Sequence, residues 1–294
     1  GINSAAGGSL AISGGSQTLA GASTYTGGTT ISGGTLQLGN GGTTGSILGD
    51  VANGGKLAFN PFDTYTIAGA ISGGGNVQQI GAGILELTGN SSYIGATNVL
   101  SGALEVNGSI ASSSLTSVGA GARLFGTGTV GNTQLNNGGV FMPGSGAAGS
   151  SMTVSGNLAF QSGATYQLQL NSTTSSLANV TGTATLGGAT VNATYVLSDS
   201  VATKYTLLNA AGGVSGTFGS LVNANSPPAN FTPSLSYDAN NAYLNFALNF
   251  SPSSGGVTRV GGLCLASKSE GFFDDAGYPS FRMLARSLAI ELHE

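Results

Sequence analysis

Few side chains of this chain could do acid–base or metal chemistry, since only 6% of its 294 residues are charged. Before residue 251 the carboxylates and cations are Asp50, Asp63, Glu86, Glu105, Asp199, Asp238, Lys56, Arg123 and Lys204. Only Glu86 and Glu105 have a spacing that indicates proximity. They hold the same place in LELTG (85–89) and LEVNG (104–108), 19 residues apart. On stacked parallel strands they would lie about 4.8 Å apart.

This glutamate pair has two interpretations. Neighbouring carboxylates can share a proton or bind a cation, so Glu86 and Glu105 are the candidate ligands of a weak cation site. Alternatively, they are two solvated glutamates that splay apart at little cost, which is the interpretation we favour. The equivalent positions of an earlier, similar segment are Thr18 and Gln37, so the pattern itself does not require carboxylates.

A carbohydrate-active enzyme, lyase or hydrolase, is the alternative function to weigh. Glycosidases need two carboxylates across a cleft, and lyases need a base with charged helpers. A groove that united Asp63, Glu86 and Arg123 would favour such an enzyme, but their scattered positions predict none. The single His293 and the single Cys264 both follow residue 250, which leaves the body without a base for a Ser–His–Asp triad and Cys264 without partners at zinc spacing. We therefore predict no catalytic residue, no cofactor and no enzyme activity.

The elements that position these residues follow from a repeat. Residues 12–38 return 68 positions later as residues 80–106, with apolar class kept at matched positions. The matches include Ile12 with Ile80, Leu19 with Leu87, Tyr25 with Tyr93, Ile31 with Val99 and Leu36 with Leu104. Such a pattern is typical of units that stack and share one core. Inside it, QTLAG (17–21) is echoed 19 residues on by LQLGN (36–40). A coil of about 20 residues made of short strands predicts a parallel β-helix.

Short alternating segments separated by glycine-rich turns fit that fold. The expected strands lie at 9–12, 29–31, 35–38, 56–59, 65–71, 76–80, 84–88 and 103–106. Their period of two predicts that Leu19, Leu38, Leu87 and Val106 all face the core on stacked strands.

Two further patterns have a functional and a structural interpretation. Threonines 24, 26, 29, 30 and 35 could form the flat row of an ice-binding solenoid, or simply reflect the β propensity of threonine. Tyr25 and Tyr93 could form a ladder that stacks on sugars, or each could pack over its neighbouring turn. We favour the structural interpretation of both.

Composition narrows the class of protein. A hydrophobic content of 40% argues against disorder despite 52 glycines. The net charge is −4 with no basic stripe, so nucleic acid is not an expected partner. No apolar run reaches 18 residues, so no membrane-spanning helix is expected. The start, GINSAAGG, has no methionine and no signal-peptide pattern, and we interpret the chain as an excised fragment.

Three parts are expected along the chain. Residues 1–110 form the repeat coils, and residues 111–250 form the last coils and a cap, with 12 of the 21 aromatic residues. Residues 251–294 hold nine of the 18 charged residues and could be a linker, a disordered tail or vector-encoded sequence. We expect no solenoid strand there, and a short helix is possible in PSFRMLARSLAIELHE (279–294).

Several segments resemble a known family. TYTGGTTISGGTLQLGNGG (24–42) resembles the passenger-associated transport repeat of bacterial autotransporters, which belong to type V secretion. The segments GTGTVGNTQLNNGGVFMPGS (126–145), VSGNLAFQSGATYQLQL (154–170), VTGTATLGGATVNA (180–193) and KYTLLNAAGGVSGTFGSL (204–221) together resemble the autochaperone, or junction, region of pertactin-like passengers.

The resemblance implies an all-β fold, a right-handed parallel β-helix with a C-terminal β cap that closes by about residue 250. It also implies a passenger exported through the periplasm and outer membrane of a Gram-negative bacterium to the cell surface or medium. Its partner would be its own outer-membrane β-barrel, for which the residues after 250 offer no strand series. The expected function is a non-catalytic, adhesin-type stalk whose C-terminal part promotes folding, with a host-cell or carbohydrate ligand.

Overall fold

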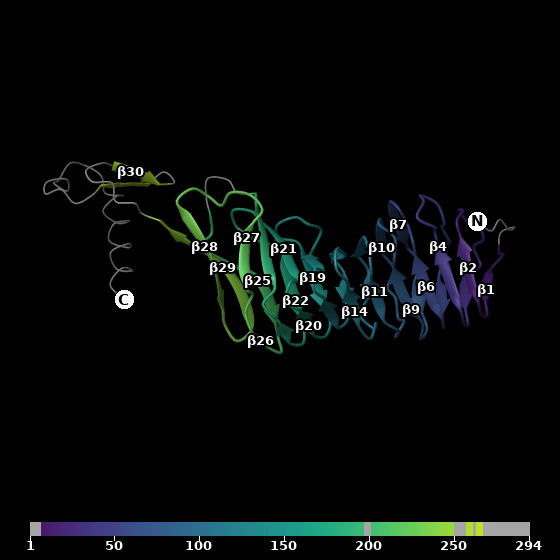
Figure 1. Cartoon of the computed structure of the whole chain (residues 1–294). Coiled ribbons are helices and arrows are strands. Elements are labelled where there is room, and N and C mark those ends of the chain that lie inside the picture. The colour runs from purple at the N-terminus through teal and green to yellow at the C-terminus, as the bar shows by residue number, and fades with distance from the viewer. Residues whose placement is uncertain (1–6, 197–200, 250–256, 261–262, 267–294) are drawn as a thin grey trace. The chain divides into compact units, whose positions relative to one another are not determined.

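The computed structural model of the chain describes residues 7–196, 201–249, 257–260 and 263–266 (Figure 1). The chain divides into two compact units, Gly1–Leu248 and Asn249–Glu294. Within the described ranges no helix is long and apolar enough to cross a lipid bilayer.

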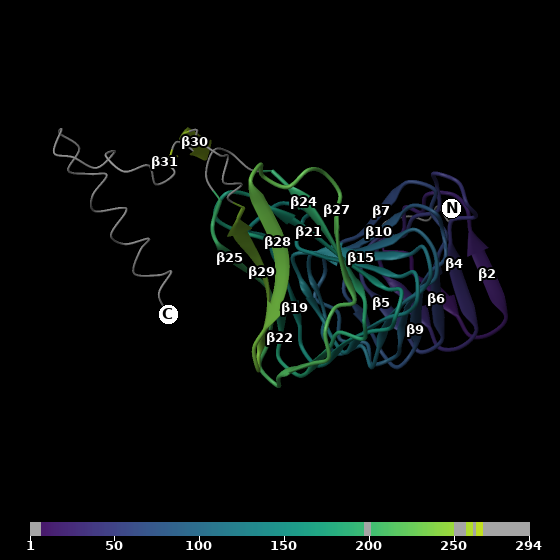
Figure 2. The ribbon, with the colours of Figure 1, turned by 60° about the vertical axis from the view of Figure 1, so that its left-hand side comes forward.

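The first unit is a stack of coils with three walls (Figures 1 and 2). The wall that we call the long face is one sheet of ten strands, all paired in parallel. Its strands are β2 (Ser16–Leu19), β4 (Thr35–Leu38), β6 (Lys56–Phe59), β9 (Asn76–Gln79), β11 (Thr97–Val99), β14 (Thr116–Val118), β17 (Thr133–Leu135), β20 (Leu158–Phe160), β23 (Ala184–Thr185) and β26 (Val214–Ser215).

The second wall, the glutamate face, is a parallel sheet of eight strands that includes Glu86 and Glu105. Its strands are β7 (Thr64–Ile67), β10 (Ile84–Leu87), β12 (Ala103–Val106), β15 (Arg123–Gly126), β18 (Val140–Pro143), β21 (Thr165–Leu170), β24 (Thr190–Tyr195) and β27 (Ser220–Asn223).

The third wall, the cap face, consists of two sheets in line. The first holds β1 (Leu10–Ile12), β3 (Thr29–Ile31), β5 (Val51–Asn53) and β8 (Ile71–Ser72). The second holds β13 (Ser109–Ile110), β16 (Thr129–Val130), β19 (Ser151–Val154), β22 (Leu177–Val180), β25 (Lys204–Ala210), β29 (Asn241–Leu248) and β28 (Phe231–Tyr237). Residues 90–92 join them, because the Ser92 N–H donates to the Ile71 carbonyl and the Ser91 N–H to the Ser109 carbonyl.

Parallel connections of this kind wind in the right-handed sense, so the predicted fold class, a right-handed parallel β-helix, is confirmed. The predicted inward positions are also confirmed. Leu19 pairs with Leu38 and Leu87 with Val106, and each is at most 4% exposed. One predicted strand is wrong: 65–71 is two strands, β7 and β8, because the chain turns a corner at residues 68–70 and continues on another wall.

The two copies of the repeat lie on different walls. Leu19 belongs to the long face, whereas its counterpart Leu87 belongs to the glutamate face. Ile31 belongs to the cap face, whereas its counterpart Val99 belongs to the long face. The 68-residue shift is thus three coils plus one wall. The same apolar pattern suits each wall because all three send alternate residues into one core.

Each copy replaces one wall strand by a loop that holds a buried tyrosine. Tyr25 and Tyr93 are both fully buried, and their hydroxyls pair with Oγ1 of Thr29 at 2.8 Å and of Thr97 at 2.6 Å. Burial raises the pKa of Tyr93 to about 12. Sugar stacking would need exposed rings, so that alternative is wrong and the packing interpretation is confirmed.

Two residues after each tyrosine, the coil touches the coil before it. A Cβ on Gly95 would lie 2.1 Å from the Gly75 carbonyl oxygen, and one on Gly27 would lie 2.8 Å from the Gly7 and Gly8 carbonyl oxygens. Both copies therefore read Tyr-X-Gly-X-Thr, in which tyrosine and threonine form the buried pair and glycine permits the close approach.

The C-terminal end of the stack is closed by antiparallel strands. β29 pairs with β25 on one side and β28 on the other. Asn225 and Asn240 serve open backbone groups of the last coil: the Asn225 amide pairs with the N–H and carbonyl of Tyr195, and the Asn240 Nδ2 donates to the Ala210 carbonyl at 2.8 Å.

The cap hairpin is fastened at its turn by Asp238. Its carboxylate accepts hydrogen bonds from the Tyr243 hydroxyl (2.6 Å) and from the N–H groups of Asn240 and Asn241. These bonds, that of Tyr243 first, lower the pKa of Asp238 to about 2. Lys204 lies 3.5 Å from the centre of the Tyr243 ring, in a cation–π contact.

In the second unit, β30 (Val257–Val260) and β31 (Leu263–Ala266) pair with each other in an antiparallel hairpin, which the sequence analysis did not predict. Cys264 belongs to β31. The helix expected in 279–294 and His293 lie outside the described residues.

The close contact at Gly95 gives a testable prediction. Gly95→Ala should lower the free energy of unfolding by about 1–3 kcal/mol, because the new methyl group overlaps the Gly75 carbonyl. Gly74→Ala is the control: a Cβ there meets nothing within 4 Å, so the change should stay within about 0.5 kcal/mol. Urea unfolding followed by circular dichroism measures both. Equal losses would contradict the role given to Gly95.

Candidate functional site

Glu86 and Glu105 lie opposite each other on β10 and β12 of the glutamate face. Asn107 bridges them, since its Nδ2 donates to Glu86 Oε1 at 3.0 Å and to Glu105 Oε1 at 2.9 Å. Thr66, one strand earlier, donates its hydroxyl to Glu86 Oε2 at 2.7 Å. The sequence analysis predicted the proximity of the glutamates but missed Asn107, whose position two residues after Glu105 places it on the next turn.

The orientation of Asn107 decides what this cluster can bind. Its Oδ1 accepts the N–H of Thr127 at 3.2 Å and the Thr127 hydroxyl at 3.3 Å. The amide N–H groups must then point at the carboxylates, where they compensate two negative charges as a cation would. Throughout the described part of the chain, no group of three His, Cys, Asp or Glu could hold a metal ion. Cation binding by Glu86 and Glu105 stays a prediction.

The other charged residues lie apart from this pair. Arg123 on β15 continues a different row, in register with Ala103, while Glu105 faces Phe125. Asp63 lies at the corner before β7. Among the residues that the structure describes, no hydrogen bond or ion pair joins Asp63, Glu86 and Arg123, the set that would favour a carbohydrate-active enzyme. Asp199 lies outside the described residues.

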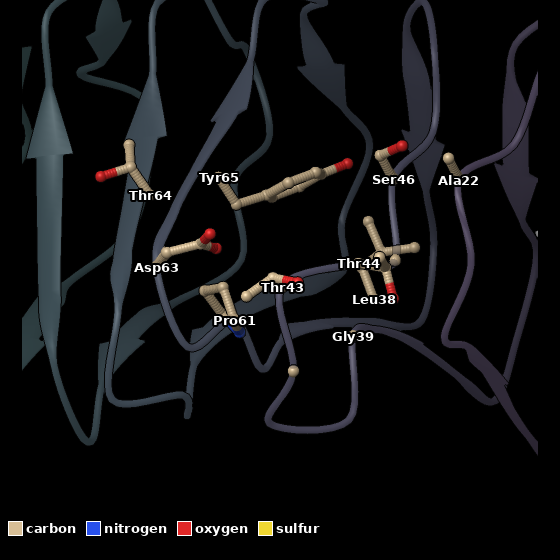
Figure 3. Close-up of a pocket in the computed structure, with 12 residues that line it drawn as sticks. Ala22, Leu38, Gly39, Thr43, Thr44, Ser46, Pro61, Asp63, Thr64 and Tyr65 are labelled. Carbon is tan, nitrogen blue, oxygen red and sulfur yellow. The ribbon is translucent and has the colours of Figure 1, made fainter.

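A small hollow of about 120 Å³ opens beside Asp63 (Figure 3). Its wall consists of the loop 39–46 and the start of β7. Tyr65 closes one side, and its hydroxyl accepts the N–H of Ile47 at 3.0 Å. Pockets for small-molecule ligands usually hold about 300–1,000 Å³, so this hollow fits only a small group. The sequence signal for it was GNGGTTGS (39–46), which lengthens one coil.

The predicted threonine row does not form. Thr29 points inward beside Tyr25, Thr30 lies exposed on the cap face, and Thr35 belongs to the long face. A flat ice-binding surface needs its threonines on one wall, so that alternative is wrong for these residues.

Comparison with known proteins matches this architecture. Residues 12–38 and 77–106 match the family described as Passenger-associated-transport-repeat. The chain is 42% identical over 93 residues to the adhesin BmaC autotransporter of Brucella suis, and 31% identical over 167 residues to an extracellular serine protease of Serratia marcescens. The chain is an autotransporter passenger domain.

The matched segments are limited in extent. They cover 31% of this passenger and 3% of the Brucella adhesin, and 53% of this passenger and 15% of the Serratia protease. Both relatives are bacterial cell-surface or extracellular proteins by name, and the passenger is likewise a cell-surface or secreted bacterial protein. The family match falls on both copies of the tyrosine loop and its flanking strands.

The amide bridge generates a prediction about metal binding. Asn107→Asp should replace a donor by a third carboxylate, and Ca²⁺ affinity should rise by about tenfold or more because carboxylate oxygens are its preferred ligands. Asn98→Asp is the control, since its neighbours on the long face, Gln78 and Ser117, are uncharged. Calorimetric titration with Ca²⁺ measures this. Tight binding by the unchanged passenger would show instead that Asn107 turns away to admit the ion.

Proposed function

We propose that this passenger is a non-catalytic, adhesin-type stalk whose C-terminal part promotes folding during export across the outer membrane. The supporting observation is the contrast between the two ends of the stack. Residues 1–110 repeat a plain parallel coil, whereas residues 111–250 contain the aromatic cluster and the antiparallel cap. In a solenoid, stability is a sum over coils and their contacts, so the better-packed end forms first and templates the rest.

The aromatic cluster is centred on Tyr166. Its ring stacks on Phe141 (5.9 Å between centroids) and on Phe218 (5.6 Å), and Phe160 meets it edge-on at 5.8 Å. The Tyr166 hydroxyl donates to the Leu207 carbonyl, and burial raises the pKa of Tyr166 above its usual value. Contacts of this kind add about 0.5–1.5 kcal/mol each beyond area burial.

A second cluster joins the cap to the last coil. Phe246 of β29 contacts Tyr195 and Tyr205, each at 5.8 Å, and Phe231 of β28 at 6.3 Å. In the coils before residue 111, the aromatic contact is Phe59 with Tyr65. This distribution supports a folding role for the C-terminal half.

The partners follow from the same proposal. The passenger would be exported through the periplasm and outer membrane by its own outer-membrane β-barrel, with the cap end leading. Its ligand would be a host-cell or carbohydrate surface, and the adhesin name of the Brucella relative supports this.

The protease name of the Serratia relative supports a competing enzyme hypothesis, which a serine-hydrolase probe tests. We expect no labelling of the passenger by a fluorophosphonate, because the described residues contain no histidine that could activate a serine. Trypsin is the positive control. Stoichiometric labelling abolished by one serine-to-alanine substitution would establish catalysis and overturn the non-catalytic proposal.

The folding role is tested by refolding kinetics. Phe160→Leu and Phe59→Leu each remove packing from a buried ring and should each cost about 1 kcal/mol of stability. Phe160→Leu should slow refolding by about threefold, because its contacts form in the transition state, while Phe59→Leu should mainly speed unfolding. Stopped-flow refolding from urea measures both rates. A larger refolding defect in Phe59→Leu would place the nucleus in the N-terminal coils.

A further inference from the structure

An uninterrupted row of uncharged side chains follows the outside of the long face, where β2, β4, β6, β9, β11 and β14 lie side by side in Figure 1. We call this row the amide ladder. In register order it is Thr18, Gln37, Ala58, Gln78, Asn98, Ser117, Gln134, Ala159, Thr185 and Ser215. Parallel pairing in register spaces its members by about 4.8 Å.

The long face differs in charge from the glutamate face. Lys56 is the one charged residue in the ten strands of the long face, whereas the strands of the glutamate face contain Glu86, Glu105 and Arg123. The chain carries a net charge of −4, so two copies repel each other in general. Because the long face holds no carboxylate in its strands, it is the wall on which two copies can approach without like-charge repulsion.

The middle of the ladder has free hydrogen-bonding capacity. Gln134 and Asn136 bond to each other, and Asn136 bonds to Ser117. In the described structure the side-chain amides of Gln78 and Asn98 have no such protein partner. An amide is both donor and acceptor, so an identical ladder is a surface that can satisfy it.

Exposed leucines flank this same stretch. Leu100 directly follows β11 and is 54% exposed, and Leu115 directly precedes β14 and is 37% exposed. They lie on opposite borders of the ladder. When two copies meet face to face with their axes parallel, opposite borders meet, so Leu100 of one copy comes beside Leu115 of the other.

We propose that the long face is a self-association surface, which packs against the long face of a second copy through the amide ladders. Stacked sheets of this kind lie about 10 Å apart, and Asn and Gln ladders stabilise them. Ten strands about 4.8 Å apart, with three outward positions across, give a footprint of roughly 600 Å² per copy. A stable interface needs about 800 Å² per partner. The contact is therefore weak for one pair and effective where many copies share a surface. The inference does not depend on the proposed stalk function.

The test uses beads coated with the passenger, which supply the many copies that a weak contact needs. Unchanged passenger should make the beads clump, as followed by turbidity and microscopy. The double substitution Gln78→Glu with Asn98→Glu places carboxylates in the centre of the contact and should reduce clumping by about tenfold or more, with partial recovery in high salt. The stack of Glu86 on Glu105 shows that the fold accommodates two glutamates in register.

Ser109→Glu with Thr129→Glu is the matched control, because these residues form an equivalent outward pair on the cap face. This variant should clump like the unchanged passenger, and thermal unfolding should show all three proteins folded. Absence of clumping by the unchanged passenger, or an equal loss in both variants, would overturn the proposal. Clumping that requires an added neutral polysaccharide would also overturn it, since the occupant of the long face would then be a glycan.

Discussion

The whole molecule depends on the close approach of one coil to the next. Parallel strands in register must lie about 4.8 Å apart on all three walls at once, so the corners that join the walls also come into backbone contact. At such corners a Cβ has no room. One on Gly83 would lie 2.1 Å from the Asp63 carbonyl oxygen, and one on Gly126 would lie 2.2 Å from the Val106 carbonyl oxygen. The glycine content is thus a consequence of stacking rather than of flexibility.

A stack of this kind transfers its difficulty to its ends. Each coil satisfies the backbone groups of its neighbour, so the last coil leaves strand edges open. The C-terminal end answers with a change of strand direction at β29, with amide side chains that occupy backbone groups, and with Pro233 in the edge strand β28. The Asp238 N–H donates toward β29, to the Asn241 carbonyl. Pro233 lies five positions earlier, where the alternation of an antiparallel strand points the nitrogen to the open edge. Since proline has no N–H, this edge offers one donor fewer to another chain.

Much of this fold was predictable because its constraints are local and periodic. The alternation in 84–87 and 103–106 gave the strands β10 and β12, and the 19-residue echo predicted that Glu86 would face Glu105. The position of each wall was not predictable from the repeat, because the shift of three coils plus one wall depends on coil lengths such as the longer loop at 39–50. The Asn107 bridge and the hollow beside Asp63 were missed for a related reason. Both join residues of successive coils through side chains or loops that have no period.

The phase of the repeat also separates what its copies encode from what they display. The residues identical in both copies include Leu19, Tyr25, Thr29 and Leu36, which face the core, and Gly27, which touches the previous coil. The outward positions differ, since Thr18 and Gln37 become Glu86 and Glu105. Because the copies lie on different walls, identical outward residues would not form one continuous surface in any case. The repeat therefore encodes coil formation, and any binding surface must arise from a single wall across many coils.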